Sequence, residues 1–327
     1  MASLDLQVLG DAMAWRSAGH AVTLFTVVQT WGSAPRQPGA LLAVRDDGAI
    51  SGSVSGGCVE DDLIARTRAT LETTGPTPQL VKPTVITYGA DADQASRFGL
   101  PCGGTLRLVR ESLPDTTWIA QLLARTAAHQ PVARTLTLAS GAVQLSDAVR
   151  GQATRFDGIT LTTVFGPRWR LLLIGAGQLS QAVAQIAVML DFDVLLCDPR
   201  EAFAATAGGG MRGVRRVDGM PDDVVREMRP DAHTAVVALT HDAKLDDLAL
   251  LEALRSGAFY VGALGSLRNQ NARKQRLAEH FNLSAQELVR LHGPVGLALG
   301  AKTPAEIAVA IVAEMVQVKN AVAGGAA

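Results

Sequence analysis

Cysteine, aromatic residues and net charge are all scarce in this sequence of 327 residues. Its three cysteines, Cys58, Cys102 and Cys197, form no CxxC pair and are too few for a disulfide framework, which excludes a disulfide-stabilised scaffold. Aromatic residues make up 4 % of the chain, so we expect no stacking surface for single-stranded nucleic acid. A formal net charge of −1 creates no long-range field that would attract nucleic acid.

An export signal and long apolar runs are also missing. The first residues, MASLDLQVLGDAMAW, include Asp5 and Asp11 and show no basic segment followed by an apolar core, so we predict no signal peptide. No apolar run approaches the ~18 residues of a membrane-spanning helix. With 48 % apolar and 19 % charged residues, the chain is expected to be a soluble protein of the cytoplasm, a reducing compartment.

The chain is long enough for two domains, and its pattern changes at FGPRWR, residues 165–170. We expect an α+β domain over 1–165, in which helices and short strands are joined by turns such as Asp47-Gly48. Over 170–327, apolar strands alternate with helices, which predicts a Rossmann-like, doubly wound parallel sheet covered on both faces. The last helix should begin at Pro304, with a capping box formed by Thr303 and Glu306.

A glycine-containing turn, GAGQLS over residues 175–180, joins the first strand of the second domain to its helix. Such a turn lets a phosphate approach the helix N-terminus, where unpaired N–H groups attract an anion. Asp198 ends the next strand and is expected to accept hydrogen bonds from ribose hydroxyls, while Arg200 is expected to contact a phosphate. Ser180 stands where glycine or alanine is usual, and a sheet with no ligand is the alternative. The residues assigned to this site are Gly175, Gly177, Gln178, Asp198 and Arg200.

Two Gly-Gly pairs adjoin cysteines in the first domain, in SGGCVE (55–60) and CGG (102–104). Successive glycines can form a nest of N–H groups that holds an anion. The helix expected to start near Cys58 should lower the pKa of that thiol, although Glu60 in the same turn opposes this effect. For each cysteine the alternative is a small buried apolar residue, which is our expectation for Cys197. The residues assigned here are Gly56, Gly57, Cys58, Glu60, Cys102, Gly103 and Gly104.

Three further segments carry candidate polar residues. Arg36 stands between two prolines in GSAPRQPG (32–39), and a rigid loop suits the binding of phosphate or carboxylate. His241 follows a predicted strand at the edge where such sheets bind ligands, and Gly265 and Ser266 form another turn into a helix. A solvated arginine and an ordinary turn histidine are the alternatives. That helix is basic, which indicates either a solvated face or a docking face for an acidic partner; its basic residues are Arg268, Arg273, Lys274 and Arg276.

These fragments, in this order, resemble the XdhC/CoxI family, the accessory proteins of xanthine dehydrogenase and related molybdenum hydroxylases. The resemblance runs over nearly the whole chain, through GSAPRQPG, GSVSGGCVE, CGG, LLLIGAGQLSQAVA, YVGALGSLRNQNARKQRL and LHGPVGLALGAKTPAEIAVAI. One departure lies near the C-terminus, where the family usually has Gly-Leu-Asp-Ile-Gly. This chain has GLALG at 296–300 and so lacks that carboxylate.

The resemblance implies a chaperone that binds molybdenum cofactor, supports its sulfuration and inserts it into an apo-hydroxylase; some members handle the cytosine dinucleotide form. It implies roles for Cys102 with Gly103 and Gly104, for the Gly56, Gly57 and Glu60 segment and for Arg36, but it does not settle which atoms contact the cofactor. A thiol such as that of Cys102 suits the soft, sulfur-rich metal end. The phosphate end of the cofactor suits the turn at 175–177, and we expect a dry cleft between the domains to hold the whole cofactor. The implied partners are the large subunit of an apo molybdenum hydroxylase, a cysteine desulfurase and a cofactor nucleotidyltransferase, with no nucleic acid and no membrane. A homodimer stays open.

Two other classes of function compete with a chaperone. An NAD(P)-dependent oxidoreductase is favoured by the glycine turn and Asp198, but neither tyrosine, Tyr88 or Tyr260, has a lysine four residues further on to form a hydride-transfer pair. A structural assembly protein without a ligand is the third class. It would be favoured only if the purified protein stayed free of pterin.

Overall fold

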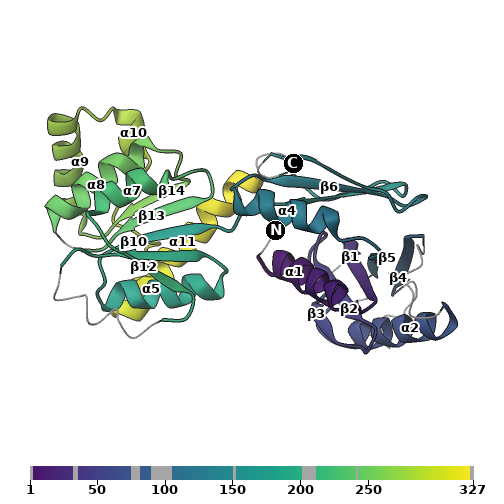
Figure 1. Cartoon of the computed structure of the whole chain (residues 1–327). Coiled ribbons are helices and arrows are strands. Elements are labelled where there is room, and N and C mark those ends of the chain that lie inside the picture. Colours follow the sequence, from purple (N-terminus) through teal and green to yellow (C-terminus); the bar gives the residue numbers. More distant parts are fainter. Residues whose placement is uncertain are drawn as a thin grey trace. The chain divides into compact units, whose positions relative to one another are not determined.

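The computed structural model describes residues 3–31, 36–74, 82–89, 105–149, 152–200, 211–240 and 242–324. The chain divides into two compact units, Met1–Pro167 and Arg168–Ala327 (Figure 1). The apolar clusters of the first unit draw only on residues up to 165, and those of the second only on residues from 169 onward. Each unit therefore buries a hydrophobic core of its own.

The first unit is an α+β domain with two antiparallel sheets, ordered β3-β2-β1-β5-β4 and β7-β6-β9-β8. Helix α1 buries Val8, Leu9 and Ala12 in a core that it shares with the first sheet and with α4. The elements are α1 (Ser3–Ser17), β1 (Val22–Trp31), β2 (Leu41–Arg45), β3 (Ile50–Gly52), α2 (Cys58–Thr74), β4 (Thr84–Tyr88), β5 (Thr105–Ser112), α4 (Thr117–Ala127), β6 (Val132–Thr137), β7 (Val143–Asp147), β8 (Arg155–Phe156) and β9 (Thr160–Phe165).

Glycines with positive φ make the tight turns of this unit. The predicted turn at Asp47-Gly48 is confirmed: Gly48 has a φ of +88°, and the Asp47 carboxylate accepts the N–H of Ala49 at 3.0 Å. Gly141 and Gly158 serve the hairpins β6–β7 and β8–β9 with φ values of +72° and +89°. Only glycine adopts a positive φ at no steric cost, so these turns can be predicted from the glycines in the sequence.

The second unit is a six-stranded, wholly parallel sheet with helices on both faces, as predicted. The strand order is β12-β11-β10-β13-β14-β15, so the order reverses between β10 and β13. The elements are β10 (Arg170–Ile174), α5 (Gln178–Met189), β11 (Asp193–Cys197), β12 (Val214–Val217), α7 (Pro221–Met228), β13 (Thr234–Ala238), α8 (Ala243–Arg255), β14 (Tyr260–Ala263), α9 (Leu267–Phe281), α10 (Ala285–Val289), β15 (Leu291–His292) and α11 (Pro304–Gly324).

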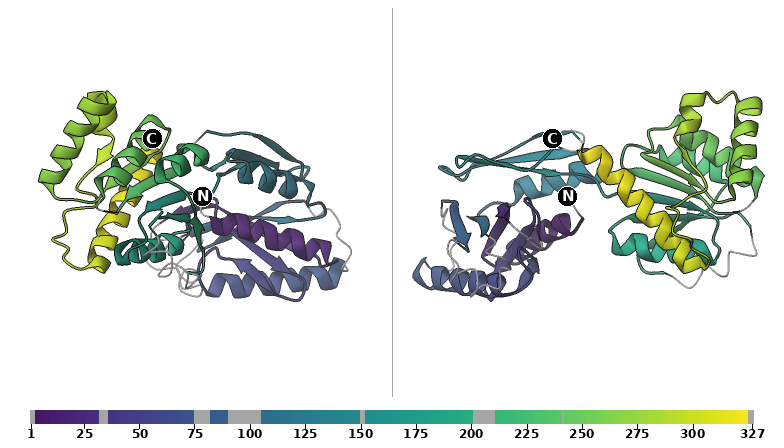
Figure 2. Two further views of the ribbon diagram at one scale, coloured as in Figure 1. Left: turned by 60° about the vertical axis from the view of Figure 1, so that its left-hand side comes forward. Right: turned by 180° about the vertical axis from the view of Figure 1, so that it is seen from behind.

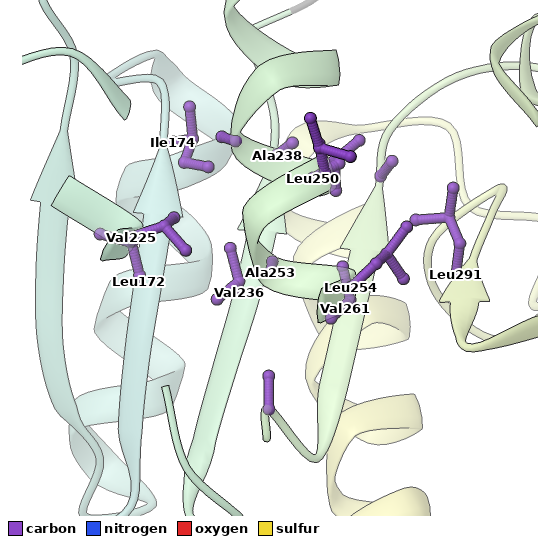
Figure 3. Close-up of a cluster of buried hydrophobic side chains, with 14 of the residues drawn as sticks. Leu172, Ile174, Val225, Val236, Ala238, Leu250, Ala253, Leu254, Val261 and Leu291 are labelled. Atoms are coloured by element: carbon purple, nitrogen blue, oxygen red, sulfur yellow. The ribbon is translucent and has the colours of Figure 1, made fainter. Parts of the chain in front are cut away.

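Alternate residues of the buried strands point into two separate cores. On one face, Leu172 and Val236 pack against α7, α8 and α9, in the cluster drawn in Figure 3. On the other face, Leu171 and Val237 pack against α5 and α11, the long C-terminal helix that is yellow in Figure 2. Because both faces are covered, the strands read as continuous apolar runs rather than as alternating patterns.

The C-terminal helix begins as the sequence predicts. Glu306 donates its N–H to Thr303 Oγ1 at 3.3 Å and accepts the N–H of Thr303 at 2.9 Å, which completes the capping box before Pro304. None of the helices in the described part of the chain is long and apolar enough to cross a membrane.

Candidate functional site

The strand order reverses between β10 and β13, and doubly wound sheets bind ligands at the carboxyl ends of the strands beside such a reversal. Gly175 leaves β10 with a φ of +103°, and a Cβ atom there would lie 3.1 Å from Thr240 Cγ2 and 3.2 Å from the carbonyl carbon of Leu239. Two constraints therefore require glycine at 175: the backbone conformation and the close approach of the segment that follows β13.

Gly177 has a different role, because its φ of −72° is open to any residue. No described atom lies within 4 Å of a Cβ atom placed there, so the side-chain position faces open space. Gly177 is the N-cap of α5, and no side chain caps the helix, so its first N–H groups point toward the carboxyl edge of the sheet. Gln178 is the first residue of that helix, and Ser180, one turn in, is 1 % exposed with a hydroxyl that finds no partner among the described residues.

Asp198 and Arg200 lie beside this turn, where β11 ends. The Asp198 carboxylate accepts the N–H of Ala176 at 2.8 Å, which ties the glycine turn to β11. It also accepts the Arg200 N–H at 3.1 Å and the guanidinium nitrogens Nε and Nη2 at 2.8 and 2.7 Å. Burial raises the pKa of Asp198, but the hydrogen bonds from Arg200 and Ala176 outweigh it, so the pKa lies below its ordinary value.

The ends of β13 and β14 complete this edge of the sheet. Thr240 donates its hydroxyl to the fully buried Asp246 at 2.6 Å, and burial raises the pKa of that aspartate. Gly265 has a φ of +153°, and Ser266 is the N-cap of α9, accepting the N–H of Asn269 at 3.2 Å. The predicted residues Gly175, Gly177, Gln178, Asp198, Arg200, Gly265 and Ser266 therefore share one edge of one sheet.

In the first unit, the loop before α2 wraps around Glu60. Its carboxylate accepts the N–H groups of residues 54–57 at 2.8–2.9 Å, the Ser53 hydroxyl at 2.9 Å and the Ser55 hydroxyl. Burial raises the pKa of Glu60, but these hydrogen bonds dominate and lower it to about 2. The anion held by this nest is therefore a side chain of the protein, and the predicted contacts of Gly56 and Gly57 with a ligand stay a prediction.

The other predicted residues are placed as follows. Arg36 lies 3.9 Å from the buried Asp5, which also accepts the N–H of Leu41 at 3.1 Å. Cys197 is fully buried at the end of β11, as expected for a structural cysteine, and burial raises the pKa of its thiol to about 11. Cys102, Gly103, Gly104 and His241, and the side chain of Cys58, lie outside the described residues.

Comparison with known proteins decides the family. The family model described as the XdhC Rossmann domain matches residues 171–315, and that of the XdhC and CoxI family matches residues 15–89. An Escherichia coli protein named molybdenum cofactor insertion chaperone PaoD is 30 % identical over 312 residues, which cover 92 % of this chain and 85 % of that protein. The chain belongs to the XdhC/CoxI family.

Two further relatives agree with this family. A Bacillus subtilis protein, named as a probable subunit of xanthine dehydrogenase, is 28 % identical to this XdhC/CoxI chain, over 92 % of the chain and 94 % of that protein. A Bacillus halodurans protein, whose crystal structure is described as that of a xanthine dehydrogenase, has the same fold with a TM-score of 0.74. It is 23 % identical, and the match covers 100 % of this chain and 98 % of that one. Because the match covers the whole chain, the fold of each unit is shared with that protein.

The sequence pattern does not mark several polar residues that the fold of this XdhC/CoxI protein brings into contact. Arg216 of β12 donates to the main-chain carbonyl of Asp198 at 3.4 Å. Glu314 of α11 accepts hydrogen bonds from the Tyr260 hydroxyl at 2.5 Å and from the Gly296 N–H at 2.8 Å, and its other oxygen lies 3.0 Å from His292 Nδ1. No local motif marks such residues, because each acts through a partner far away in the sequence. Among the described residues there is no cluster of His, Cys, Asp or Glu that could hold a metal ion.

Proposed function

We propose that this XdhC/CoxI protein is a chaperone that binds molybdenum cofactor as its cargo and delivers it to a molybdenum hydroxylase in the cytoplasm. The observation that supports this most directly is the identity of 30 %, over 92 % of the chain, to the protein named molybdenum cofactor insertion chaperone PaoD. The Bacillus subtilis relative carries a xanthine dehydrogenase name, which favours the same class of client.

The donors of the second unit fit the phosphate end of this cargo. Molybdenum cofactor ends in a phosphate, or in a diphosphate and cytidine in its dinucleotide form, and both are anions. The uncapped N–H groups at the start of α5 and the guanidinium of Arg200 lie at one edge of the sheet, and open space at Gly177 leaves room for a phosphate to approach. We assign the phosphate end of the cargo to this edge.

The first unit is assigned a different task. Because Glu60 accepts the N–H groups of residues 54–57, these four donors are already paired in this arrangement. We assign Glu60 a positioning role, in which it shapes the loop that precedes Cys58. The thiol of Cys102 is our proposed contact for the metal end, since thiolates are preferred ligands of soft metal centres. Protection of the sulfido ligand during sulfuration would follow from such a contact.

Anaerobic purification tests this function. We expect the protein expressed with a molybdenum cofactor supply to carry molybdenum and a pterin that fluoresces after oxidation, and Cys102→Ala to lose both. Cys197→Ala, which changes a buried thiol of the core, is the matched control and should keep both. Purified loaded protein should also activate an apo molybdenum hydroxylase. A protein free of pterin and molybdenum, and inactive in that reconstitution, would contradict the proposal. If the protein does carry the cofactor, binding measurements with each form would distinguish the form without a nucleotide from the cytosine dinucleotide form.

The alternative of an NAD(P)-dependent oxidoreductase gains no support from the site. Asp198, the residue expected to bind the ribose of NAD, directs its oxygens to Ala176 and Arg200. Both tyrosine hydroxyls also form hydrogen bonds within the protein: that of Tyr88 donates to Asp62 at 2.6 Å, and that of Tyr260 donates to Glu314.

A further inference from the structure

A second group of polar side chains lies at the outer strand of the sheet, where β15 meets α11. Glu314 of α11 accepts the Tyr260 hydroxyl at 2.5 Å and the Gly296 N–H at 2.8 Å, and its other oxygen lies 3.0 Å from His292 Nδ1. Tyr260 is 1 % exposed, whereas the side chains of Glu314 and His292 are 17 % and 28 % exposed. None of these three side chains takes part in the contacts proposed above for the cargo.

The charge of Glu314 decides which nitrogen of His292 carries hydrogen. Burial raises the pKa of Glu314, but the hydrogen bonds from His292, Tyr260 and Gly296 outweigh it, so the pKa lies below its ordinary value. An ionised carboxylate only accepts hydrogen bonds, so we assign the hydrogen to Nδ1, the nitrogen that faces Glu314. In a neutral imidazole the second nitrogen, Nε2, is then an acceptor with a lone pair.

The ring of His292 is held in one orientation. It stacks on the ring of Tyr260, with centroids 4.5 Å apart and an angle of 26° between the planes, while Glu314 fixes Nδ1. Nε2 has no hydrogen-bond partner among the described residues, yet it is not buried, so its lone pair is open to solvent. An imidazole that donates one N–H to a carboxylate and leaves its other nitrogen open has the arrangement of a metal-binding histidine.

His292 lies at the same edge of the sheet as the glycine turn. It ends β15 and pairs with Gly262, one residue before the end of β14, so it lies near the carboxyl ends of the strands. Leu291 points into the core formed with α8 (Figure 3), so His292 points to the opposite face, which carries α5 and α11. His292 and the N-terminus of α5 therefore share one face and one edge of the sheet.

We propose that His292 Nε2 binds a metal centre that brings most of its own ligands, with Glu314 as the positioning residue. The described residues contain no cluster of three or more His, Cys, Asp or Glu side chains that could hold a metal ion, so a bare ion would find too few protein ligands here. A metal that is already chelated needs only one further donor.

The inference rests on the proposed function for the source of this metal, because the cargo carries its molybdenum already bound to the sulfur atoms of the pterin. In that case His292 is a further donor for the metal end, in addition to the thiol of Cys102. Other chelated transition metals offer the same chemistry, since imidazole nitrogen is a common ligand of such metals. The test must therefore separate the two sources.

Histidine-selective NMR tests the site on the full-length protein without cargo. In protein labelled with ¹⁵N-histidine, we expect His292 to show the tautomer with hydrogen on Nδ1. Titration with the iminodiacetate chelate of Cu²⁺, a metal with its own ligands and open positions, should broaden the His292 signal at a lower concentration than the His280 signal. His280 lies in the last turn of α9, is exposed and has no carboxylate partner among the described residues. His292→Gln assigns the signal, and thermal unfolding checks that the fold is kept.

Two further variants separate the role of Glu314 from simple exposure of the ring. Glu314→Gln should weaken binding of the chelate at His292 about ten- to a hundredfold, the usual cost of removing such a carboxylate partner, and should lower the share of the tautomer with hydrogen on Nδ1. His280→Gln is the matched control and should leave both the tautomer and the binding at His292 unchanged.

Loaded protein identifies the source of the metal. After partial reduction, the Mo(V) electron paramagnetic resonance signal of protein labelled with ¹⁵N-histidine should show a ¹⁵N coupling that disappears in His292→Gln and stays in His280→Gln. This coupling, together with preferential broadening of His292 by the chelate, supports the inference with the cofactor as the source. Preferential broadening without the coupling supports it with another chelated metal as the source.

Equal broadening of His292 and His280, or hydrogen on Nε2 of His292, overturns the inference. Protein that carries no molybdenum contradicts the proposed function alone, because the titration with the copper chelate decides the inference independently of the cargo.

Discussion

Glu60 illustrates how one side chain can organise a loop that has no regular structure. It gathers N–H groups from residues 54–57, which would otherwise need water or a ligand, and it lies in the first turn of α2, where a negative charge is stabilised by the helix dipole. The SGGCVE segment therefore carries its own counter-ion. Glycine is favoured at position 56, because the loop closes around the carboxylate with a φ of +92° there.

The low pKa of Glu60 predicts a loss of stability in acid. Its pKa is about 2 in the folded protein against 4.5 for the free side chain, so the unfolded state binds more protons on acidification. The contribution of this group is complete above pH 4.5 and disappears as the pH falls toward 2, with a size of about 3 kcal/mol. Urea unfolding between pH 6 and pH 2, followed by a probe in the first unit, measures it.

Two variants at neighbouring positions make this measurement specific. Glu60→Gln should lower the free energy of unfolding at pH 6 by about 2–3 kcal/mol, because four N–H groups lose their anionic acceptor, and should flatten the acid dependence. Asp61→Asn removes the same charge from the next residue of the turn and should keep the wild-type slope. An unchanged slope in Glu60→Gln would mean that the carboxylate contributes nothing to the folded state.

At the scale of elements, α9 shows how a basic helix can be a structural helix. Of its four basic residues Arg268, Arg273, Lys274 and Arg276, two form ion pairs with α8. The buried Arg273 binds Asp247 at 3.0 Å and Asp246 at 3.4 Å, and the partly exposed Arg276 binds Asp247 at 2.7 Å. Both aspartates belong to α8, so the two helices are joined through buried charges on one face of the sheet. Half of the positive charge that the sequence pattern attributes to a docking face is therefore paired with α8.

Removal of Arg273 should therefore destabilise the second unit strongly. Arg273→Ala leaves the fully buried Asp246 without its cation, whereas Asp247 keeps its pair with Arg276. Breaking a buried pair on one side costs about 3–5 kcal/mol. Lys274→Ala, at the next position of the same helix, should change the free energy of unfolding by less than about 0.5 kcal/mol. Chemical denaturation of both variants gives the comparison. Equal stabilities would show that the network adds nothing to the packing of α8 against α9.

At the scale of the whole molecule, the main feature is that the cores are separate. The first unit has three apolar clusters and the second has two among the described residues, and no cluster combines residues from both. The sheet of the second unit is also formed within that unit, because every strand from β10 to β15 pairs with another strand of the same unit. A unit with its own core and its own sheet has what it needs to fold alone.

Residues 168–327, produced alone, should therefore fold. We expect a mixed α/β circular dichroism spectrum and a single cooperative thermal transition. A fragment that starts at residue 199 is the control: it lacks β10, the central strand, together with α5 and β11, and should not unfold cooperatively. A fragment 168–327 without a cooperative transition would show that the first unit is needed for the second to fold.

Much of this architecture follows from local sequence. Positive-φ glycines, β-branched runs and the Thr303–Glu306 capping box each have a cause within a few residues, so the hairpins, the parallel sheet and the start of α11 were predictable. The position of the glycine turn beside Asp198 was also predictable, because parallel neighbouring strands end at the same edge. The short helices α7 and α10 could not be predicted in this way, because a short helix contains too few residues to show a helical period.

The amino-acid pattern was enough to predict the parallel sheet with its alternating strands and helices, the family, and that the ends of β10 and β11 meet at one edge of the sheet. Only the folded structure shows which partner each charged side chain binds. Asp198 is directed to Arg200 and Ala176, Glu60 to its own loop, and Arg273 to α8. The physical reason is that a charged side chain in a folded protein binds the nearest good partner in space, and the distance to that partner along the chain leaves no local signal.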